Sequence, residues 1–126
     1  MKRVYLSHPY GGKAENRDAA CAVAAMYRYI WEQDGVDAVI INPLELLAGC
    51  DGLLDDQHIL NAAIDLMLGC DAVIFCAGWR QSNGCKEEYE IAETARMHIE
   101  DLDAEVERAA VHWFGKHRVI VKRMVA

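Results

Sequence analysis

The sequence predicts an α/β fold, in which a parallel sheet is covered by helices on both faces. Short apolar runs at residues 3–7, 37–41 and 71–76 indicate strands, and the third run lacks the polar alternation of a half-exposed strand. Longer segments with apolar residues three and four positions apart separate these runs, as in amphipathic helices. Such alternation favours a parallel sheet, and 126 residues with 53% hydrophobic content suffice for a single domain, residues 1–126, with its own core.

The first half of the chain has the order strand, loop, helix, strand. The strand at 3–7 ends at a loop, residues 8–13, where a proline and two adjacent glycines stop the strand and let a ligand approach the backbone. A helix is predicted from about Glu15 to Asp34, because a glycine follows as a natural C-terminal stop. The second strand, residues 37–41, ends at an Asn-Pro pair.

The second half adds helices around the buried strand. We expect a short helix at residues 44–48, a loop at 49–56, a long helix at 55–68 and the strand at 71–76. A loop at 77–84 then leads into a helix that opens near Cys85. One helix or two follow up to Gly115, with a break near Asp101, and a last strand is predicted at Val119–Val121.

Right-handed crossovers between these strands favour the order 2-1-3-4, a flavodoxin-like three-layer sandwich with a parallel sheet of four to five strands. In that order the loops at 7–13 and 77–84 meet at the switch point between the first and third strands. Open α/β sheets bind their ligands at this place. We therefore expect the functional site between these two loops.

Composition excludes several classes of protein. A net charge of −7 and a pI near 5.1 argue against a polymeric nucleic acid or a membrane surface as partner, although a local site for a small anion is compatible with them. No apolar run reaches the length of a membrane span, and no signal peptide is evident. The five cysteines form no CxxC pair, which indicates reduced thiols and a cytoplasmic protein. The histidines lack metal-binding spacing, so no metal or other cofactor is expected.

Glu88 is the candidate catalytic carboxylate. It lies in the first turns of the helix that opens near Cys85, at the C-terminal edge of the predicted sheet. The positive end of the helix dipole would favour its ionised form there, which suits a nucleophile better than a general acid. The alternative is structural, because glutamates are common in the first turn of helices and two more, Glu87 and Glu90, lie beside it.

The glycine loop after the first strand is a candidate phosphate site. Backbone N–H groups of Gly11 and Gly12, together with the Lys13 ammonium, are suitable donors to a phosphate. The motif is neither GxGxxG nor a Walker loop, and a plain tight turn is the alternative interpretation.

Two motifs at these loops resemble the nucleoside 2-deoxyribosyltransferase superfamily, which includes the 2′-deoxynucleoside 5′-monophosphate N-glycosidases and a related bacterial and phage group. The first is VYLSHPYGG at residues 4–12, similar to the family's opening strand and glycine loop. The second is CDAVI at residues 70–74, followed by Gly78-Trp79 and then by Ser82-x-Gly84-x-x-x-Glu88-x-x-x-Ala92. The resemblance extends from Val4 to about Ala95.

By this resemblance Glu88 matches a nucleophile that attacks the sugar C1′. The attack forms a glycosyl-enzyme ester as the base leaves, and the ester passes to water in a hydrolase or to another base in a transferase. Tyr5 matches a tyrosine that positions the sugar or the nucleophile, although packing on the sheet is an alternative. The motifs also place Ser7, Gly78 and Gly84 among the substrate-binding positions.

The residue type at position 82 bears on whether the substrate is a free nucleoside or a nucleotide. The resemblance implies that transferases of free nucleosides have an acid at this position, which binds the 5′-hydroxyl, whereas nucleotide hydrolases have a serine that can bind a 5′-phosphate. An aspartate would repel a phosphate, and a serine can donate to it. With Gly11, Gly12 and Lys13, Ser82 therefore favours a nucleotide, unless it is a plain turn residue.

Three further positions keep two interpretations each. Trp79 could stack on the base or pack in the core, and Arg80 could approach the phosphate or project into solvent. His8 replaces a small residue usual in relatives, and it could contact the substrate or act as a pH-sensitive group.

One position departs from the family pattern. Relatives have an aspartate eight residues before the equivalent of Asp71, where it holds the sugar or protonates the base, but this chain has Ala63 there. Asp65 is the nearest acid, although two residues turn it about 200° around a helix. Either the helix is offset, Asp65 acts differently, or this function is missing.

Three functions follow from these residues. The first is an N-glycosidase or transferase acting on a (deoxy)nucleoside 5′-monophosphate through Glu88. The second is a non-catalytic nucleotide-binding module, and the third is a free-nucleoside 2-deoxyribosyltransferase. The resemblance also implies a homodimer or higher homo-oligomer.

Overall fold

The computed structural model describes residues 1–50 and 53–125, with side chains described up to residue 115. Asp51 and Gly52, within the loop predicted at 49–56, lie outside the described residues. The described elements, in chain order, are β1 (Lys2–Ser7), α1 (Ala14–Asp34), β2 (Ala38–Ile41), α2 (Pro43–Leu46), the 3-10 turn η1 (Ala48–Cys50), α3 (Asp56–Leu68), β3 (Ala72–Phe75), the 3-10 turn η2 (Trp79–Gln81), α4 (Asn83–Thr94), β4 (His98–Asp101) and α5 (Ala104–Val125).

The sheet is parallel throughout the described residues and has the order β2-β1-β3-β4. This confirms the predicted flavodoxin-like α/β sandwich and its 2-1-3-4 order. In the register of the two central strands, Ser7 of β1 lies beside Phe75 of β3. The loops that follow these two residues therefore begin next to each other at the C-terminal edge of the sheet.

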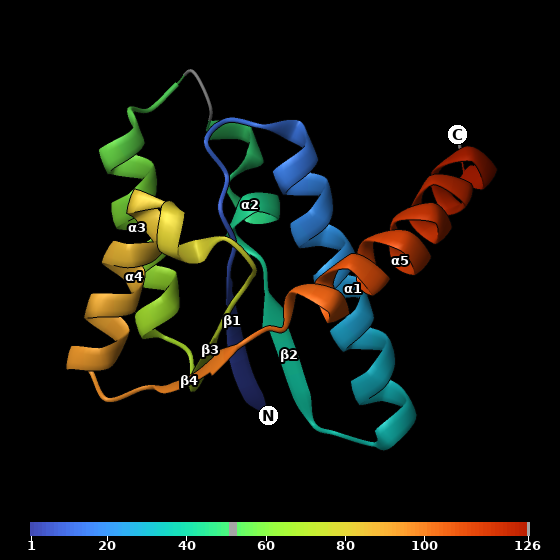
Figure 1. Ribbon diagram of the computed structural model, residues 1–126, viewed down its shortest axis with the longest axis horizontal. Helices are drawn as coiled ribbons and strands as arrows, with labels where there is room; N and C mark the ends of the chain where they lie inside the picture. The colour runs from blue at the N-terminus through green and yellow to red at the C-terminus, as the bar shows by residue number, and fades with distance from the viewer. Residues whose placement is uncertain (51–52, 126) are drawn as a thin grey trace.

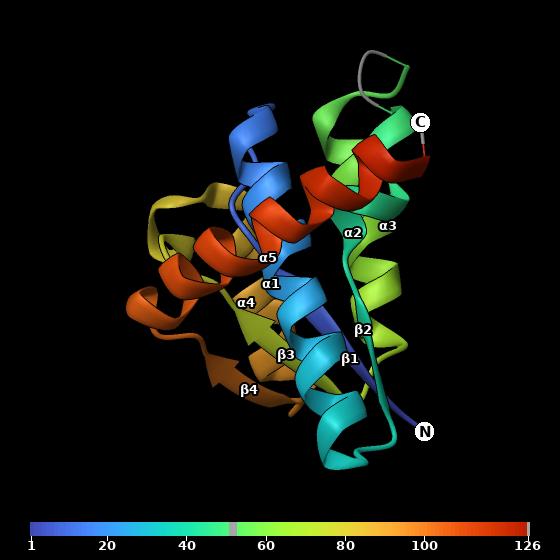
Figure 2. The same ribbon diagram turned by 90° about the vertical axis from the view of Figure 1, so that its right-hand side faces the viewer.

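Helices cover the two faces of the sheet in separate pairs (Figure 1). Val4 and Leu6 of β1 pack in a core with residues of α1 and α5, and Tyr5 packs in a second core with residues of α3 and α4. Figure 2 shows α5 running across α1 on their shared face. Because successive side chains of a strand point to opposite faces, alternate residues of β1 and β3 face the two pairs of helices.

The fourth strand differs from the prediction. Residues 119–121 belong to α5, which continues through Gly115, so the predicted final strand at Val119–Val121 is wrong. The strand is β4 instead, with the sequence His-Ile-Glu-Asp and mostly exposed side chains. It is an edge strand with one neighbour, β3, so it does not need the apolar run that marks a buried strand.

Side-chain caps fix where the helices around the sheet edge begin. Asn42 accepts a hydrogen bond from the N–H of Leu44 at the start of α2, Asp55 accepts one from His58 in α3, and Ser82 accepts one from Cys85 in α4. Such caps satisfy N–H groups that have no partner within the helix. The starts of α3 and α4 are thereby set beside the ends of β1 and β3.

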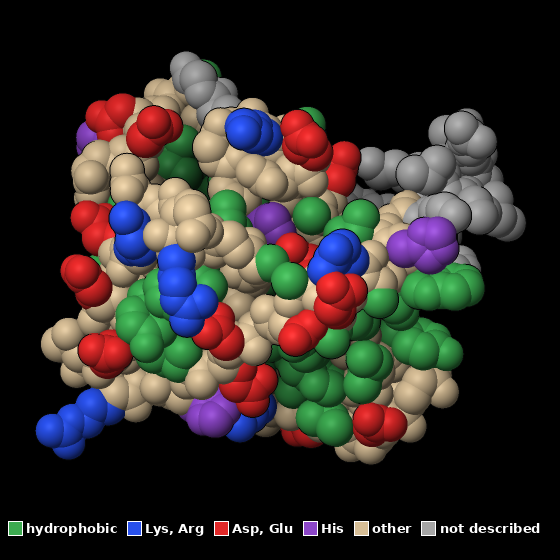
Figure 3. Space-filling view, in the orientation of Figure 1, with side chains coloured by type: hydrophobic (Ala, Val, Ile, Leu, Met, Phe, Trp, Pro, Cys, Tyr) green, Lys and Arg blue, Asp and Glu red, His purple; other side chains and the backbone are tan. Residues whose placement is uncertain are grey.

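The surface carries mixed charge. Figure 3 shows acidic groups distributed over this face with Lys and Arg side chains between them, not one broad basic patch. Among the described residues no helix combines the length and the apolar character needed to cross a bilayer. Exposed apolar side chains include Tyr29 of α1 and Trp113 of α5.

Arg96 adopts a left-handed backbone conformation, φ 57°, between α4 and β4. This conformation costs a residue with a Cβ about 1 kcal/mol. We therefore expect the free energy of unfolding of Arg96→Gly to exceed that of Arg96→Ala by about 0.5–1 kcal/mol. Arg96→Ala is the control, because it also lacks the charge but keeps the Cβ. Urea unfolding measures the difference, and a glycine variant less stable than the alanine variant would contradict it.

Candidate active site

A cavity of about 630 Å³ opens at the C-terminal edge of the sheet. Its lining comes from the β1–α1 loop, from α2 and the start of α3, and from residues 81–85 and 88 at the start of α4. Its volume is typical of small-molecule sites, and its position is the switch point where open α/β sheets bind ligands. The two loops that the sequence predicts to be neighbours both contribute to it.

Glu88 is buried at this cavity, with 6% of its surface exposed. The Tyr5 hydroxyl donates a hydrogen bond to Glu88 Oε2, and the Ser7 hydroxyl donates one to Oε1 at 3.1 Å. Tyr5 and Ser7 are two apart on β1, so both point to the α4 face of the sheet. The strand thus fixes both carboxylate oxygens.

Burial raises the pKa of Glu88 from 4.5 to about 6, although the hydrogen bonds from Tyr5 and Ser7 act in the opposite direction. The helix dipole does not keep this pKa low, because Glu88 lies beyond the first turn of α4 and the dipole effect fades within that turn. At pH 7 the carboxyl is still roughly nine-tenths ionised. The group can act as a nucleophile near neutral pH and accepts a proton in mild acid.

Two neighbouring groups stay protonated at the same pH. Burial, and then the nearby charge of Glu88, raise the pKa of Tyr5 well above 10.0, so its hydroxyl remains a donor. Burial also raises the pKa of the Cys85 thiol, which lines the cavity. Since the thiolate is the nucleophilic form of cysteine, Cys85 is held in its less nucleophilic form at pH 7, whereas Glu88 is mostly ionised.

The N-terminus of α4 forms one side of the cavity. Ser82 is the N-cap of this helix, and its Oγ accepts the N–H of Cys85 at 3.3 Å. The Ser82 side chain also hydrogen-bonds the Cys85 side chain, and the N–H groups of Asn83 and Gly84 in the first turn have no partner within the helix. Such a helix terminus favours anions.

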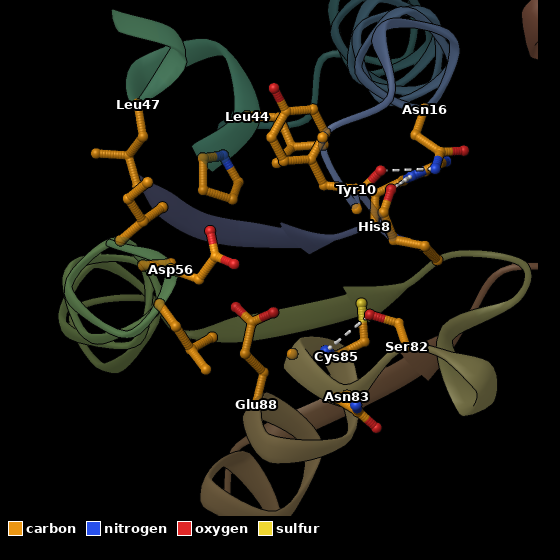
Figure 4. Close-up of a pocket in the computed structure, with 18 of the residues that line it drawn as sticks. His8, Tyr10, Asn16, Leu44, Leu47, Asp56, Ser82, Asn83, Cys85 and Glu88 are labelled. Carbon is orange, nitrogen blue, oxygen red and sulfur yellow. Dashed lines mark hydrogen bonds between the residues drawn. The ribbon is translucent and has the colours of Figure 1, made fainter. Parts of the chain in front are cut away.

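The β1–α1 loop lies across the cavity from α4 (Figure 4). Gly11 and Gly12 have φ of 58° and 73°, which glycine adopts readily, and they turn the chain into α1. Lys13 is exposed at the cavity lining, and Asn16 donates to the Tyr10 carbonyl at 2.9 Å. The predicted glycine loop thus reaches the same cavity as Ser82.

Sequence reasoning missed one charged and several apolar residues of the lining. Asp56, the first residue of α3, points into the cavity, as does Glu88 from α4 (Figure 4). Leu44 and Leu47, near α2, add an apolar surface on the same side. The N-cap pattern at Asp55 and Asp56 was a signal for the helix start, but not for its position at the cavity.

The structure also places Ala63, the position at which the superfamily that the motifs resemble has an aspartate. Ala63 lines the cavity and is buried, whereas Asp65 is exposed and is not part of the lining. The offset of α3 that would bring Asp65 inward is therefore absent. Asp56 lies on the Ala63 face of α3, but two turns earlier, which is about 10 Å along the helix.

Trp79 and Gly78 lie outside the cavity lining. Trp79 is buried, stacks on Tyr89 with ring centroids 4.5 Å apart, and donates from Nε1 to Asp101 at 2.6 Å. Arg80 lies over the Trp79 ring and pairs with Asp101. Both side chains therefore anchor this loop to β4, and neither the base platform nor the phosphate contact considered for them fits this placement.

His8 lies at the edge of the cavity, and 8% of its surface is exposed. Its Nδ1 is 2.7 Å from the Pro9 carbonyl and its Nε2 is 3.0 Å from Glu107 of α5. Of the residues predicted for the site, the structure brings eight to the cavity lining: Tyr5, His8, Gly11, Gly12, Lys13, Ser82, Gly84 and Glu88. Ser7 is not part of the lining, but its hydroxyl donates a hydrogen bond to Glu88, which is.

The region from residue 2 to residue 101 matches the model of a domain family of unknown function (DUF4406). The chain belongs to this family. The matched region holds β1 to β4, including Tyr5, Ser7 and Glu88, and α5 lies beyond it. Comparisons with curated proteins and with solved structures find no match.

Glu88→Gln is expected to stabilise the protein at pH 7. The rise of the Glu88 pKa from 4.5 to about 6 corresponds to about 2 kcal/mol, at about 1.4 kcal/mol per unit. Because the folded state binds the proton more tightly, this penalty is absent below pH 4.5 and complete above pH 6. The amide avoids it, so the gain of about 2 kcal/mol at pH 7 should vanish near pH 4.

Urea unfolding of both proteins at the two pH values measures this gain. Glu87→Gln is the matched control, because Glu87 is exposed on the same helix and its change should stay within about 0.5 kcal/mol. A Glu88→Gln variant that is less stable than wild type at pH 7, or equally stabilised at pH 4, would rule out the burial penalty.

Proposed function

We propose that the protein is an N-glycosidase that cleaves the bond between base and sugar in a (deoxy)nucleoside 5′-monophosphate, with Glu88 as nucleophile. The observation that carries the proposal is the buried carboxylate at a small-molecule cavity, held at both oxygens by the hydroxyls of Tyr5 and Ser7. The resemblance of residues 4–12 and 70–92 to the nucleoside 2-deoxyribosyltransferase superfamily supports it.

The reaction would proceed by two displacements at C1′. In the first, a Glu88 oxygen forms a bond to C1′ while the C1′–N bond breaks. The electron pair of the C1′–N bond leaves with the base, and the base takes a proton from solvent. In the second, water attacks C1′, loses a proton and releases the carboxylate. Tyr5 and Ser7 hold the carboxylate in place for attack and donate to it again when it leaves.

The rest of the cavity suits the other parts of a nucleotide. Ser82, the first N–H groups of α4 and Lys13 provide donors for a 5′-phosphate, which would meet positive helix ends there. Leu44 and Leu47 provide an apolar surface for a base, and Asp56 can accept hydrogen bonds from its amino groups. Figure 4 shows Glu88 between Asp56 and Ser82, where the sugar of such a ligand would lie.

Base release tests the proposal directly. Purified protein is incubated with ribo- and deoxyribonucleoside 5′-monophosphates, and free base is measured by chromatography. Wild type should release base, Glu88→Gln should lose at least about 10³-fold of that rate, and Glu87→Gln should retain it. The kcat/KM of wild type should fall below about pH 6, as Glu88 takes up a proton.

Undiminished release by Glu88→Gln would refute the nucleophile. Binding of a nucleotide by folded wild type, seen as a thermal shift without release from any substrate, would instead identify a binding module. That result would make Ala63 the leading explanation, because the deoxyribosyltransferase superfamily that the motifs resemble has an aspartate at this position. Base exchange between free nucleosides would identify the transferase.

Substitutions at Ser82 test the phosphate contact. Aspartate and asparagine are both good N-caps, so Ser82→Asp and Ser82→Asn should preserve α4. The negative charge of Ser82→Asp should lower the ratio of kcat/KM for the monophosphate to that for the free nucleoside by about 10²-fold, whereas neutral Ser82→Asn should change that ratio less than about tenfold. An equal effect of both variants on the ratio would place the phosphate elsewhere.

A further inference from the structure

A second cluster of reactive side chains lies on the opposite face of the sheet from Glu88. His8 and Cys76 directly follow β1 and β3, whose last residues are register partners. Cys76 belongs to the core under α1 and α5, and Glu107 of α5 reaches the same place. One ligand atom from each of the three residues lies within 4.8 Å of the other two.

The geometry around His8 leaves a gap in its hydrogen bonding. Its Nδ1 is 2.7 Å from the Pro9 carbonyl, which can only accept, so Nδ1 carries a proton. Its Nε2 and Glu107 Oε1 are 3.0 Å apart, and both are buried and outside hydrogen-bonding geometry. The side chain of His8 is 4% exposed. An imidazole nitrogen and a carboxylate oxygen that face each other in a buried place are satisfied either by a proton on Nε2 or by a metal ion that both atoms bind.

We propose that His8, Cys76 and Glu107 bind a zinc ion. Imidazole, thiolate and carboxylate are the ligands that zinc takes in proteins, and tetrahedral bonds of about 2.0–2.3 Å place neighbouring donor atoms about 3.3–3.7 Å apart. In the structure His8 Nε2 and Glu107 Oε1 are 3.0 Å apart and all three donor atoms lie within 4.8 Å of one another, so a shared ion requires the three side chains to adjust to these distances. On binding, the Cys76 thiol gives its proton to solvent and its sulfur bonds to the metal.

The hydrogen bond from Nδ1 to the Pro9 carbonyl supports this assignment. A metal-binding histidine usually donates its other N–H to a carbonyl or carboxylate, which fixes the ring and its tautomer. The His8 ring is held in this way before any ion is bound. Sequence patterns do not predict this site, because the three proposed ligands are far apart in the chain and have no recognisable spacing.

The ion would join α5 to the ends of the two central strands. Zinc binding to the folded state should therefore stabilise the protein in proportion to occupancy. The proposal does not depend on the chemistry of Glu88, whose side chain lies on the other face of the sheet, although His8 also lines the Glu88 cavity. The protein can bind zinc without releasing base, and it can release base without binding zinc, so the two experiments fail independently.

The experiment uses untagged protein, freed of metal with a chelator and then titrated with ZnCl₂ or CoCl₂. We expect one zinc per chain by elemental analysis after gel filtration, micromolar or tighter affinity by competition with a chromophoric chelator, and a Tm about 5 °C higher with zinc. The cobalt form should show a sulfur-to-cobalt charge-transfer band in the near ultraviolet. Exposed pairs such as His58 with Asp55 contain no thiol and give no such band.

Variants assign the ligands. Cys76→Ser should abolish the charge-transfer band, and Glu107→Gln should lower zinc affinity at least about tenfold. Cys21→Ser removes a buried thiol outside the cluster and should bind zinc as wild type does. Folding of each variant is checked by circular dichroism. Wild-type protein that binds no stoichiometric zinc, or a cobalt form without the sulfur band, would overturn the proposal even if a variant failed to fold.

Discussion

The hydrogen bonds from β1 to the Glu88 carboxylate are the interaction on which the site depends. Tyr5 and Ser7 supply both donors, and their two-residue spacing exists only while β1 stays extended between β2 and β3. The sheet therefore sets the carboxylate position, and α4 only has to present the side chain. Holding a charged group in this buried place costs free energy, which is common where stability is given up for function.

Much of this arrangement follows from residue patterns. The glycine loop and the helix start at Ser82 come after two apolar runs, and parallel topology brings such loops to one edge. Glu88 was predicted at this edge from the same reasoning. The rise in its pKa was not predicted, because the dipole argument uses sequence position alone and gives a shift in the opposite direction, whereas the pKa of about 6 results from burial, which only the packed structure reveals.

The elements that were missed share a physical cause. β4 is polar and at the edge, so its pairing with β3 leaves no apolar signal, while the apolar residues 119–121 lie within a helix. Trp79 was open to two interpretations, since stacking on a base and packing against Tyr89 require the same aromatic surface. Asp56 and the His8 cluster depend on contacts between distant segments, which periodicity does not encode.

The family match ends at residue 101, just before α5, so α1 and α5 cover one face of the sheet but only α1 lies within the match. The face that carries Glu88 is covered by α3 and α4, both within the matched region, whereas the opposite face receives α5 from outside it. The hydroxyls that hold Glu88 come from β1, within the matched region, whereas the Glu107 carboxylate that faces His8 comes from α5, outside it. The sheet thus separates the support of Glu88 from the helix that lies beyond the family match.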